Sequence, residues 1–228
     1  MKVVLLHAFP LDERMWQPQL EPLSEYDVAA PRLYGRGATA AEIAASVLAE
    51  HEGELAVVGA SFGGYVALEM AHQEAARVRA LVLVGARADA DTPERRAARA
   101  DTIALVEDGG AEALWEKQRP VLLLEDAPET AVAQAQQEAL GRSSDELVAA
   151  VGALRDREDR TDTLRAFGGP VLIAVGEGDG FFPPDEARAQ AQLAPHGRFR
   201  EFAGAGHLAS LEQPGEFNAA LANFLADV

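Results

Sequence analysis

The stretch VVGASFGGYV, residues 57–66, gives the strongest indication of the fold of this chain. Its valines continue an apolar run typical of a buried strand, and the residues that follow have the composition of a helix. A strand that turns directly into a helix strains the residue at the turn and exposes its side chain above the sheet. The flanking positions pass close together, which favours glycine at both. Gly59 and Gly63 occupy those positions, so the stretch predicts a strand, a sharp turn at Ser61 and a helix.

Strand-like and helix-like stretches alternate along most of the chain. Short runs predict strands over residues 2–7, 26–30, 55–59, 80–84, 171–175 and 198–202. Helices are predicted over residues 39–51, 62–75, 184–194 and 214–226. The middle strands are apolar almost throughout, as expected of parallel strands covered on both faces. The fold class is therefore α/β, a mostly parallel open sheet of about six strands with helices on both faces.

Residues 88–165 interrupt this alternation because they contain no convincing strand. Helical patterns lie over residues 93–107, 110–118, 128–140 and 143–155, separated by Gly109-Gly110, Pro120, Pro128 and Gly141. The segment is too long for a loop. We expect a helical cap, inserted in a core of residues 1–87 and 166–228, over the sheet edge where ligands bind in such folds. The alternative is a helical layer with no role at the site.

Composition excludes several classes of function. The 228 residues carry a formal net charge of −17, which argues against nucleic acid and anionic membranes as partners. There is no cysteine, which excludes disulfides, thiolate metal sites and a cysteine nucleophile. No apolar run approaches the ~20 residues that span a bilayer, and the opening MKVVLLH is too short for a signal core. We therefore expect a cytoplasmic protein.

A serine hydroxyl is a weak nucleophile, so Ser61 would need a general base. Of the five histidines, His207 fits best because AGAGHLASLEQP is a glycine-rich loop after the last predicted strand. The alternative for His207 is a loop residue that merely caps the final helix. A catalytic imidazole would also need a carboxylate to orient it and to stabilise its charged form.

Two loops offer that carboxylate. VLIAVGEGDGFFPP places Asp179 in the loop after the strand at 171–175, with Glu177 as a neighbouring candidate. Asp89 and Asp91 follow the strand at 80–84, where an acidic residue also suits the start of a cap helix. Asp179 is favoured because its Gly-Asp-Gly turn is sharp and is followed by a proline pair that can start the next helix.

A tetrahedral intermediate at Ser61 would carry a negative charge that backbone N–H groups must stabilise. The residue after the nucleophile, Phe62, predicts one donor. The loop after the first strand, His7-Ala8-Phe9-Pro10, should supply the second, and Phe9 is the candidate because proline has no N–H. The predicted oxyanion hole is therefore formed by the N–H groups of Phe9 and Phe62.

At this point the chain resembles the α/β-hydrolase superfamily from end to end, and most of all small bacterial esterases and the 3-oxoadipate enol-lactonase-like group. LLHAFPLDERMW, GASFGG and GAGHLASLEQP resemble that group's opening, its elbow and its histidine loop. GARADADTPERRAAR and DREDRTDTL resemble the entrance and exit of its cap. The order Ser61, Asp179, His207 is the chain order of these enzymes. The resemblance implies a Ser-His-Asp hydrolase with no metal and no organic cofactor.

Three departures limit the resemblance. Ala8 stands where these proteins usually have glycine, and a left-handed alanine would cost up to ~1–2 kcal/mol. PRLYGRG replaces the usual PDLRGxG, so the contacts of that Asp and Arg cannot be transferred. The chain also begins at what resembles the family's third strand, so we expect the fold to lack the N-terminal antiparallel hairpin.

Together these observations predict a serine hydrolase that cleaves a small carboxylic ester or lactone through an acyl-enzyme. Phe181, Phe182 and Leu208 are expected to line the pocket, and Trp115 is either a pocket or a core residue. One alternative is a lyase or cofactor-free oxygenase on the same triad, and another is a ligand-binding or signalling protein of the same fold. Turnover of simple esters would separate these possibilities.

Overall fold

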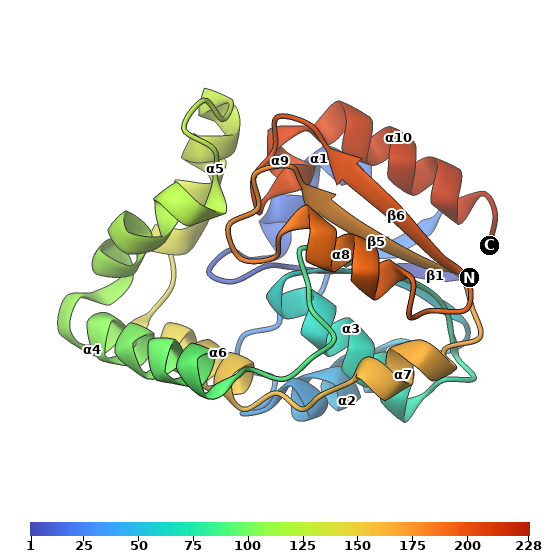
Figure 1. Cartoon of the computed structure of the whole chain (residues 1–228), viewed down its shortest axis with the longest axis horizontal. Coiled ribbons are helices and arrows are strands. Elements are labelled where there is room, and N and C mark those ends of the chain that lie inside the picture. Colours follow the sequence, from blue (N-terminus) through green and yellow to red (C-terminus); the bar gives the residue numbers. More distant parts are fainter.

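The computed structural model describes all 228 residues, and its centre is one open sheet (Figure 1). The sheet has six strands in the order β2-β1-β3-β4-β5-β6, and every neighbouring pair is parallel. The strands are β1 (Lys2–Leu6), β2 (Asp27–Ala29), β3 (Leu55–Ala60), β4 (Val78–Val84), β5 (Val171–Gly176) and β6 (Gly197–Phe202). The predicted α/β class and the six predicted strands are confirmed.

Side chains alternate between the two faces of each strand, so each face has its own apolar cluster. In β3, Val57 belongs to one cluster and Val58 to the other. The first face is covered by α2 (Ala40–Glu50), α3 (Phe62–Gln73), α7 (Thr161–Ala166) and α8 (Pro184–Ala191). The second face is covered by the short η1 (Glu13–Trp16), α1 (Gln17–Leu20) and α9 (Ala209–Glu212), and by the longer α10 (Pro214–Leu225).

Three further helices extend beyond one end of the sheet (Figure 1). They are α4 (Pro93–Leu122), α5 (Glu129–Leu140) and α6 (Ser144–Arg155). Helix α4 is broken at Gly110, whose φ of 66° and ψ of −156° are not helical. It continues past Pro120 to Leu122, contrary to the predicted break. In α6, Ser143 and Glu146 form a capping box.

The end of the 88–165 segment returns to the helices that cover the sheet. Arg160 forms an ion pair of 2.9 Å with Glu69 of α3, and His72 of α3 contacts Thr163 of α7 through a hydrogen bond of 3.1 Å. Helix α7 lies beside α2 and α3 in Figure 1, away from α4 and α5. The helices that stand apart from the sheet are therefore α4, α5 and α6, and the name cap refers to these three helices and the loops that join them.

The two outermost strands differ from the central ones. β2 has only three residues, and β6 carries two exposed arginines, Arg198 and Arg200. Both arginines form ion pairs, with Asp227 and with Glu216 respectively. None of the helices combines the length and the apolar composition needed to cross a membrane.

Candidate active site

Ser61 stands at a tight turn between β3 and α3. Its φ of 47° and ψ of −108° make it the one non-glycine residue of the chain with a positive φ. A Cβ atom on Gly59 would lie 2.3 Å from the carbonyl oxygen of Gly63, and one on Gly63 would lie 2.2 Å from that of Leu6. Only glycine allows this approach, and the strained backbone at Ser61 is typical of a functional position.

His207 and Asp179 form a buried pair next to this turn. Asp179 lies in the loop after β5 and His207 in the loop after β6, and 2.8 Å separates Oδ2 of the aspartate from Nδ1 of the imidazole. The N–H groups of Phe181 and Phe182 donate to Oδ1 of Asp179 at 2.8 and 2.9 Å. The carboxylate is thus fully hydrogen-bonded, and the Nδ1–H donor leaves Nε2 of the imidazole free to accept a proton.

Ser61 and His207 line the same cavity, which has a volume of about 410 Å³. This volume lies within the range of small-molecule sites. No direct hydrogen bond joins the two side chains in this structure. Catalytic hydrogen bonds of ligand-free enzymes are often long and shorten when substrate binds.

The other acids considered from the sequence have different partners. Asp89 forms an ion pair of 3.0 Å with Arg95. Asp91 is buried between two arginines, and Glu177 accepts a hydrogen bond of 3.1 Å from the N–H of Gly204. Of the four candidates, Asp179 is the one that contacts His207.

The predicted oxyanion donors lie on two adjacent segments. Phe62 is the first residue of α3, where a backbone N–H has no partner within the helix. Phe9 lines the cavity, and its N–H donates to no other group of the chain. The two segments are joined because the N–H of Gly63 donates to the carbonyl oxygen of His7 at 3.0 Å. Of the two predicted donor residues, Phe9 lines the cavity, whereas Phe62 does not.

Residues 3–220 match the alpha/beta hydrolase family. The chain belongs to this family. The resemblance predicted from the motifs is thus confirmed, and the chain is a hydrolase.

Three relatives indicate which part of the family is most similar. A thermophilic esterase from Thermogutta terrifontis, solved with malate bound, is 33% identical with a TM-score of 0.94, covering 100% of this chain and 90% of that one. The pimeloyl-[acyl-carrier protein] methyl ester esterase of Aromatoleum aromaticum is 31% identical over 93% of both chains. The dihydrolipoyllysine-residue acetyltransferase component of the acetoin cleaving system of Cupriavidus necator is 29% identical over 98% of this chain, which spans 63% of that protein's length.

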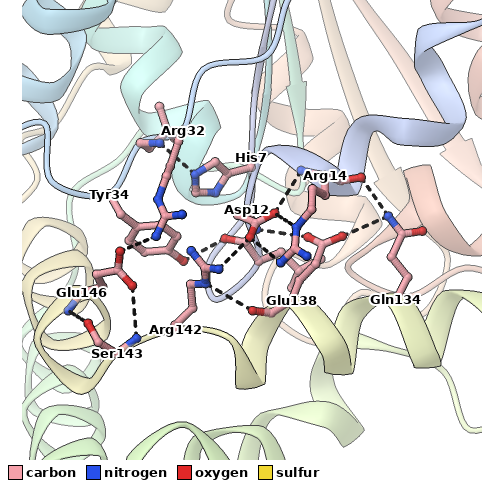
Figure 2. Close-up of polar contacts among 12 residues, drawn as sticks. His7, Asp12, Arg14, Arg32, Tyr34, Gln134, Glu138, Arg142, Ser143 and Glu146 are labelled. Atoms are coloured by element: carbon pink, nitrogen blue, oxygen red, sulfur yellow. Dashed lines mark hydrogen bonds and ion pairs between the residues drawn. The ribbon is translucent and has the colours of Figure 1, made fainter.

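In this hydrolase the loop after β1 is fixed by the neutral side chain of His7 (Figure 2). Its Nε2 accepts a hydrogen bond of 3.0 Å from the N–H of Leu33, so the proton resides on Nδ1, which donates to the carbonyl oxygen of Ala8 at 3.1 Å. Burial lowers the pKa of His7 to about 4, and the hydrogen bond to Ala8 only partly opposes this. The φ of Ala8 is not positive, so the alanine in place of the family's glycine brings no left-handed strain.

Further along this loop, Asp12 connects the hydrolase core to the cap (Figure 2). Its side chain is 1% exposed and accepts from Arg14 and from Arg142, which follows α5, at 2.8 and 2.9 Å. Burial alone would raise the pKa of Asp12, but these two arginines outweigh it and hold the pKa below its usual value. Glu138 of α5 accepts from the N–H of Asp12 at 3.1 Å, and its burial raises its pKa to about 7. The β1 loop is thus bound to the cap by ionisable groups.

Tyr34, in the stretch that departs from the family's usual motif, supports the same loop. Its hydroxyl donates to the carbonyl oxygen of Leu11 at 2.8 Å, and the guanidinium of Arg142 lies over its ring at 5.6 Å. Burial raises the pKa of Tyr34 well above its usual value, so the hydroxyl remains a donor. A tyrosine therefore anchors this loop at the Arg position of the resembled motif PDLRGxG.

The histidine loop is bound to the other end of the cap. The N–H groups of His207 and Leu208 both donate to the carbonyl oxygen of Leu122, at the end of α4. Glu212 accepts 2.9 Å hydrogen bonds from the N–H groups of Leu124 and Gly206, and burial raises its pKa. A Cβ on Gly85 would lie 2.9 Å from Nδ1 of His207, so this glycine leaves room for the imidazole. The sequence motifs gave no signal for a role of Gly85 or Glu212.

The predicted pocket residues divide into two groups. Phe181 and Phe182 line the cavity, and the ring of Phe181 makes an edge contact with His207, with 4.8 Å between centroids. Leu208 and Trp115 do not line it, and both belong to the apolar cluster of the second sheet face. This corrects the expectation for Leu208 and assigns Trp115 to the core. Other residues of α4 face the cavity instead, among them Lys117, Gln118, Val121 and Leu122.

Proposed function

We propose that this hydrolase cleaves a small carboxylic ester or lactone through an acyl-enzyme on Ser61. The observation that carries the proposal is the hydrogen-bonded pair of His207 and Asp179, 2.8 Å apart, in the wall of the cavity that also contains the strained Ser61. The two esterases among the relatives, at 33% and 31% identity, support an ester substrate.

In the first half of the reaction, Oγ of Ser61 attacks the carbonyl carbon while Nε2 of His207 takes the hydroxyl proton. Asp179 stabilises the resulting imidazolium through Nδ1 and is itself held by two backbone N–H groups. The tetrahedral intermediate collapses when His207 returns the proton to the alkoxy oxygen. An ester then releases its alcohol, and a lactone opens to a hydroxyacyl group that stays on the serine.

In the second half, water attacks the acyl carbon, again with His207 as general base, and the carboxylic acid leaves. The negative charge of each intermediate falls on the former carbonyl oxygen. The N–H groups of Phe9 and Phe62 are the proposed donors that stabilise it, and one such donor is typically worth ~10²–10³ in rate. Both phases therefore rely on the same two segments, the β1 loop and the N-terminus of α3.

A covalent probe tests the nucleophile directly. A fluorophosphonate should attach to Ser61, as located by peptide mass spectrometry, and Ser61→Ala should lower ester hydrolysis by at least ~10³-fold without loss of fold. Ser24→Ala, at an exposed serine, is the matched control and should hydrolyse esters normally. Undiminished hydrolysis by Ser61→Ala would refute the mechanism.

The substrate class requires a separate measurement. A panel of short-chain methyl esters and small lactones should include at least one that the wild type hydrolyses and Ser61→Ala does not. A protein that reacts with the probe but turns over no ester or lactone would instead perform another chemistry on the same three residues.

A further inference from the structure

The cavity that contains Ser61 has a strongly cationic wall. Its lining includes the basic residues Arg87, Arg95, Arg99, Lys117 and Arg157. These are five of the 20 lysines and arginines of the chain, although the 21 lining residues are under a tenth of its 228. In a chain of net charge −17, composition does not account for such a concentration.

Only some of these five basic residues have an acidic partner of their own. Arg87 is paired with Glu186, and Arg95 with Asp89. Lys117 and Asp101, another lining residue, are exposed, have no ion-pair partner and offset each other. Two cations and one acid of the lining then remain.

These three form one cluster in which Arg99 and Arg157 share the carboxylate of Asp91. Arg157 lies 2.6 Å from it and Arg99 3.2 Å from it. The side chains of Asp91 and Arg157 are 0% and 3% exposed. One buried carboxylate therefore faces two guanidinium groups, which leaves one positive charge in excess.

The donors of this cluster are only partly used. Arg99 donates to Asp91 through Nε alone, so both of its terminal nitrogens are without a partner in the chain. Arg157 donates through Nε and Nη1 to the carbonyl oxygens of Asp89 and Leu154, and its buried Nη2 has no partner. Buried charge without a partner is costly, and a guanidinium with two free N–H groups matches a carboxylate in a bidentate geometry.

The cluster is fixed in relation to the nucleophile. The guanidinium of Arg157 lies 4.2 Å from the ring centroid of Tyr65, a favourable cation–π geometry. Tyr65 is in the first turn of α3, and its N–H donates to the carbonyl oxygen of Ser61 at 3.3 Å. Tyr65 therefore contacts Arg157 through its ring and Ser61 through its backbone, and all three residues line the cavity.

We propose that the substrate carries a second, ionised carboxylate, which binds to the terminal nitrogens of Arg99 beside Arg157. The substrate is then a monoester of a dicarboxylic acid or a lactone that bears a carboxylate. This inference rests on the proposed function, since it names the substrate class of the same site. Asp91 is a positioning residue that holds the two guanidinium groups together, and Arg99 determines specificity.

The test compares matched substrates. The monomethyl esters of succinic, glutaric and adipic acid are measured against methyl butyrate, pentanoate and hexanoate. At least one monoester should have a kcat/KM at least ~10-fold above that of its neutral counterpart. In Arg99→Gln the carboxylate-to-neutral ratio should fall by about 10- to 100-fold, mainly through KM, because a charge-assisted hydrogen bond is worth about 1.5–3 kcal/mol. Arg96→Gln, at an exposed residue outside the lining, should keep the wild-type ratio.

Ligand binding without turnover provides an independent readout. In the Ser61→Ala protein, adipate or glutarate should raise Tm, the effect should weaken with added salt, and the further change Arg99→Gln should abolish it. Equal kcat/KM for carboxylated and neutral esters, with no effect of Arg99→Gln, would overturn the inference and leave the proposed function intact. Equal preference for sulfonated esters would overturn the assignment to a carboxylate. Absence of any ester hydrolysis, with the Tm shift preserved, would refute the proposed function alone.

Discussion

The two sides of the proposed oxyanion hole are held in place by different forces. On the Phe62 side, β3 and α3 meet backbone against backbone, and the approach is fixed by glycines that leave no room for a methyl group. On the Phe9 side, the β1 loop is held by the hydrogen bonds of His7 and by Asp12, which contacts Arg142 and Glu138 of the cap. One donor is positioned by steric repulsion, and the other by hydrogen bonds and charge.

Because these forces differ, the two donors should respond to different perturbations. Steric repulsion does not depend on pH or salt, so the Phe62 side should tolerate solution changes and fail only when volume is added. The Phe9 side depends on buried groups whose protonation changes with pH, and on Arg142 and Glu138 beyond the sheet. Three substitutions test this contrast.

The largest effect is expected for Gly63→Ala. The added Cβ would lie 2.2 Å from the carbonyl oxygen of Leu6 and 2.4 Å from its carbon, so α3 must move away from β1. We expect the free energy of unfolding to fall by at least about 4 kcal/mol, measured by urea denaturation. Gly152→Ala, within α6 and with no atom within 4 Å of its added Cβ, should instead stabilise by about 0.5–1 kcal/mol. A loss no larger than 1 kcal/mol for Gly63→Ala would show that the elbow is not held sterically.

A smaller effect is expected for Asp12→Asn, which leaves the buried Arg142 without its carboxylate. Unpairing a buried charge costs about 3 kcal/mol, and the β1 loop should lose its fixed position. We expect a fall in kcat of about 10-fold with little change in KM, because Phe9 would act on the charge that develops in the transition state. The comparison is Asp27→Asn, an exposed ion pair with Lys2, which should cost no more than about 0.5 kcal/mol. An unchanged kcat in Asp12→Asn would show that the ion pairs of Asp12 do not position the N–H of Phe9.

The smallest effect concerns Glu138, whose pKa burial raises from 4.5 to about 7. Between these values the folded protein retains a proton that the unfolded chain has released, so rising pH lowers stability. His7 acts in the opposite direction between about 4 and 6.5, because it is neutral when folded and charged when unfolded. The two contributions offset each other in the wild type, which should therefore show only a shallow pH dependence from this loop.

Glu138→Gln should expose the contribution of His7. Between about pH 5 and about pH 6.5, the unfolding free energy of the wild type minus that of the variant should fall by about 2 kcal/mol, since one pKa unit corresponds to about 1.4 kcal/mol. Chemical denaturation at a series of pH values measures this difference. Glu129→Gln, at the exposed first residue of the same helix, is the control and should give a constant difference. A difference that does not vary with pH would mean that Glu138 is ionised throughout.

Local patterns were sufficient to predict much of this molecule. The six strands follow from short apolar runs, and Ser61, Asp179 and His207 follow from turns that come directly after predicted strands. A residue at such a turn has its place fixed by the sheet, because the carboxyl ends of parallel strands share one edge.

The contacts that the sequence did not predict join distant segments of the chain. Asp91 and Arg157 lie in polar stretches that look solvated, yet they are buried against each other across the cap. Glu138 is one of several acidic residues of the cap and becomes distinctive only because α5 packs on the β1 loop. Trp115 shows the converse, since an aromatic residue on a cap helix fits pocket and core equally well until the neighbouring helices are placed.

The margins of the sheet also bear on how the protein behaves at high concentration. An outer strand exposes unpaired backbone groups that invite pairing with another molecule, and short length or charged side chains discourage this. Here one margin is three residues long, and the other presents Arg198 and Arg200, held by Glu216 and Asp227. Strand pairing through β6 would have to break the ion pairs of Arg198 and Arg200. Strand pairing through β2 could use only three residues. Edge-to-edge aggregation of the native protein is therefore disfavoured, and lasting self-association would have to bury helical surface.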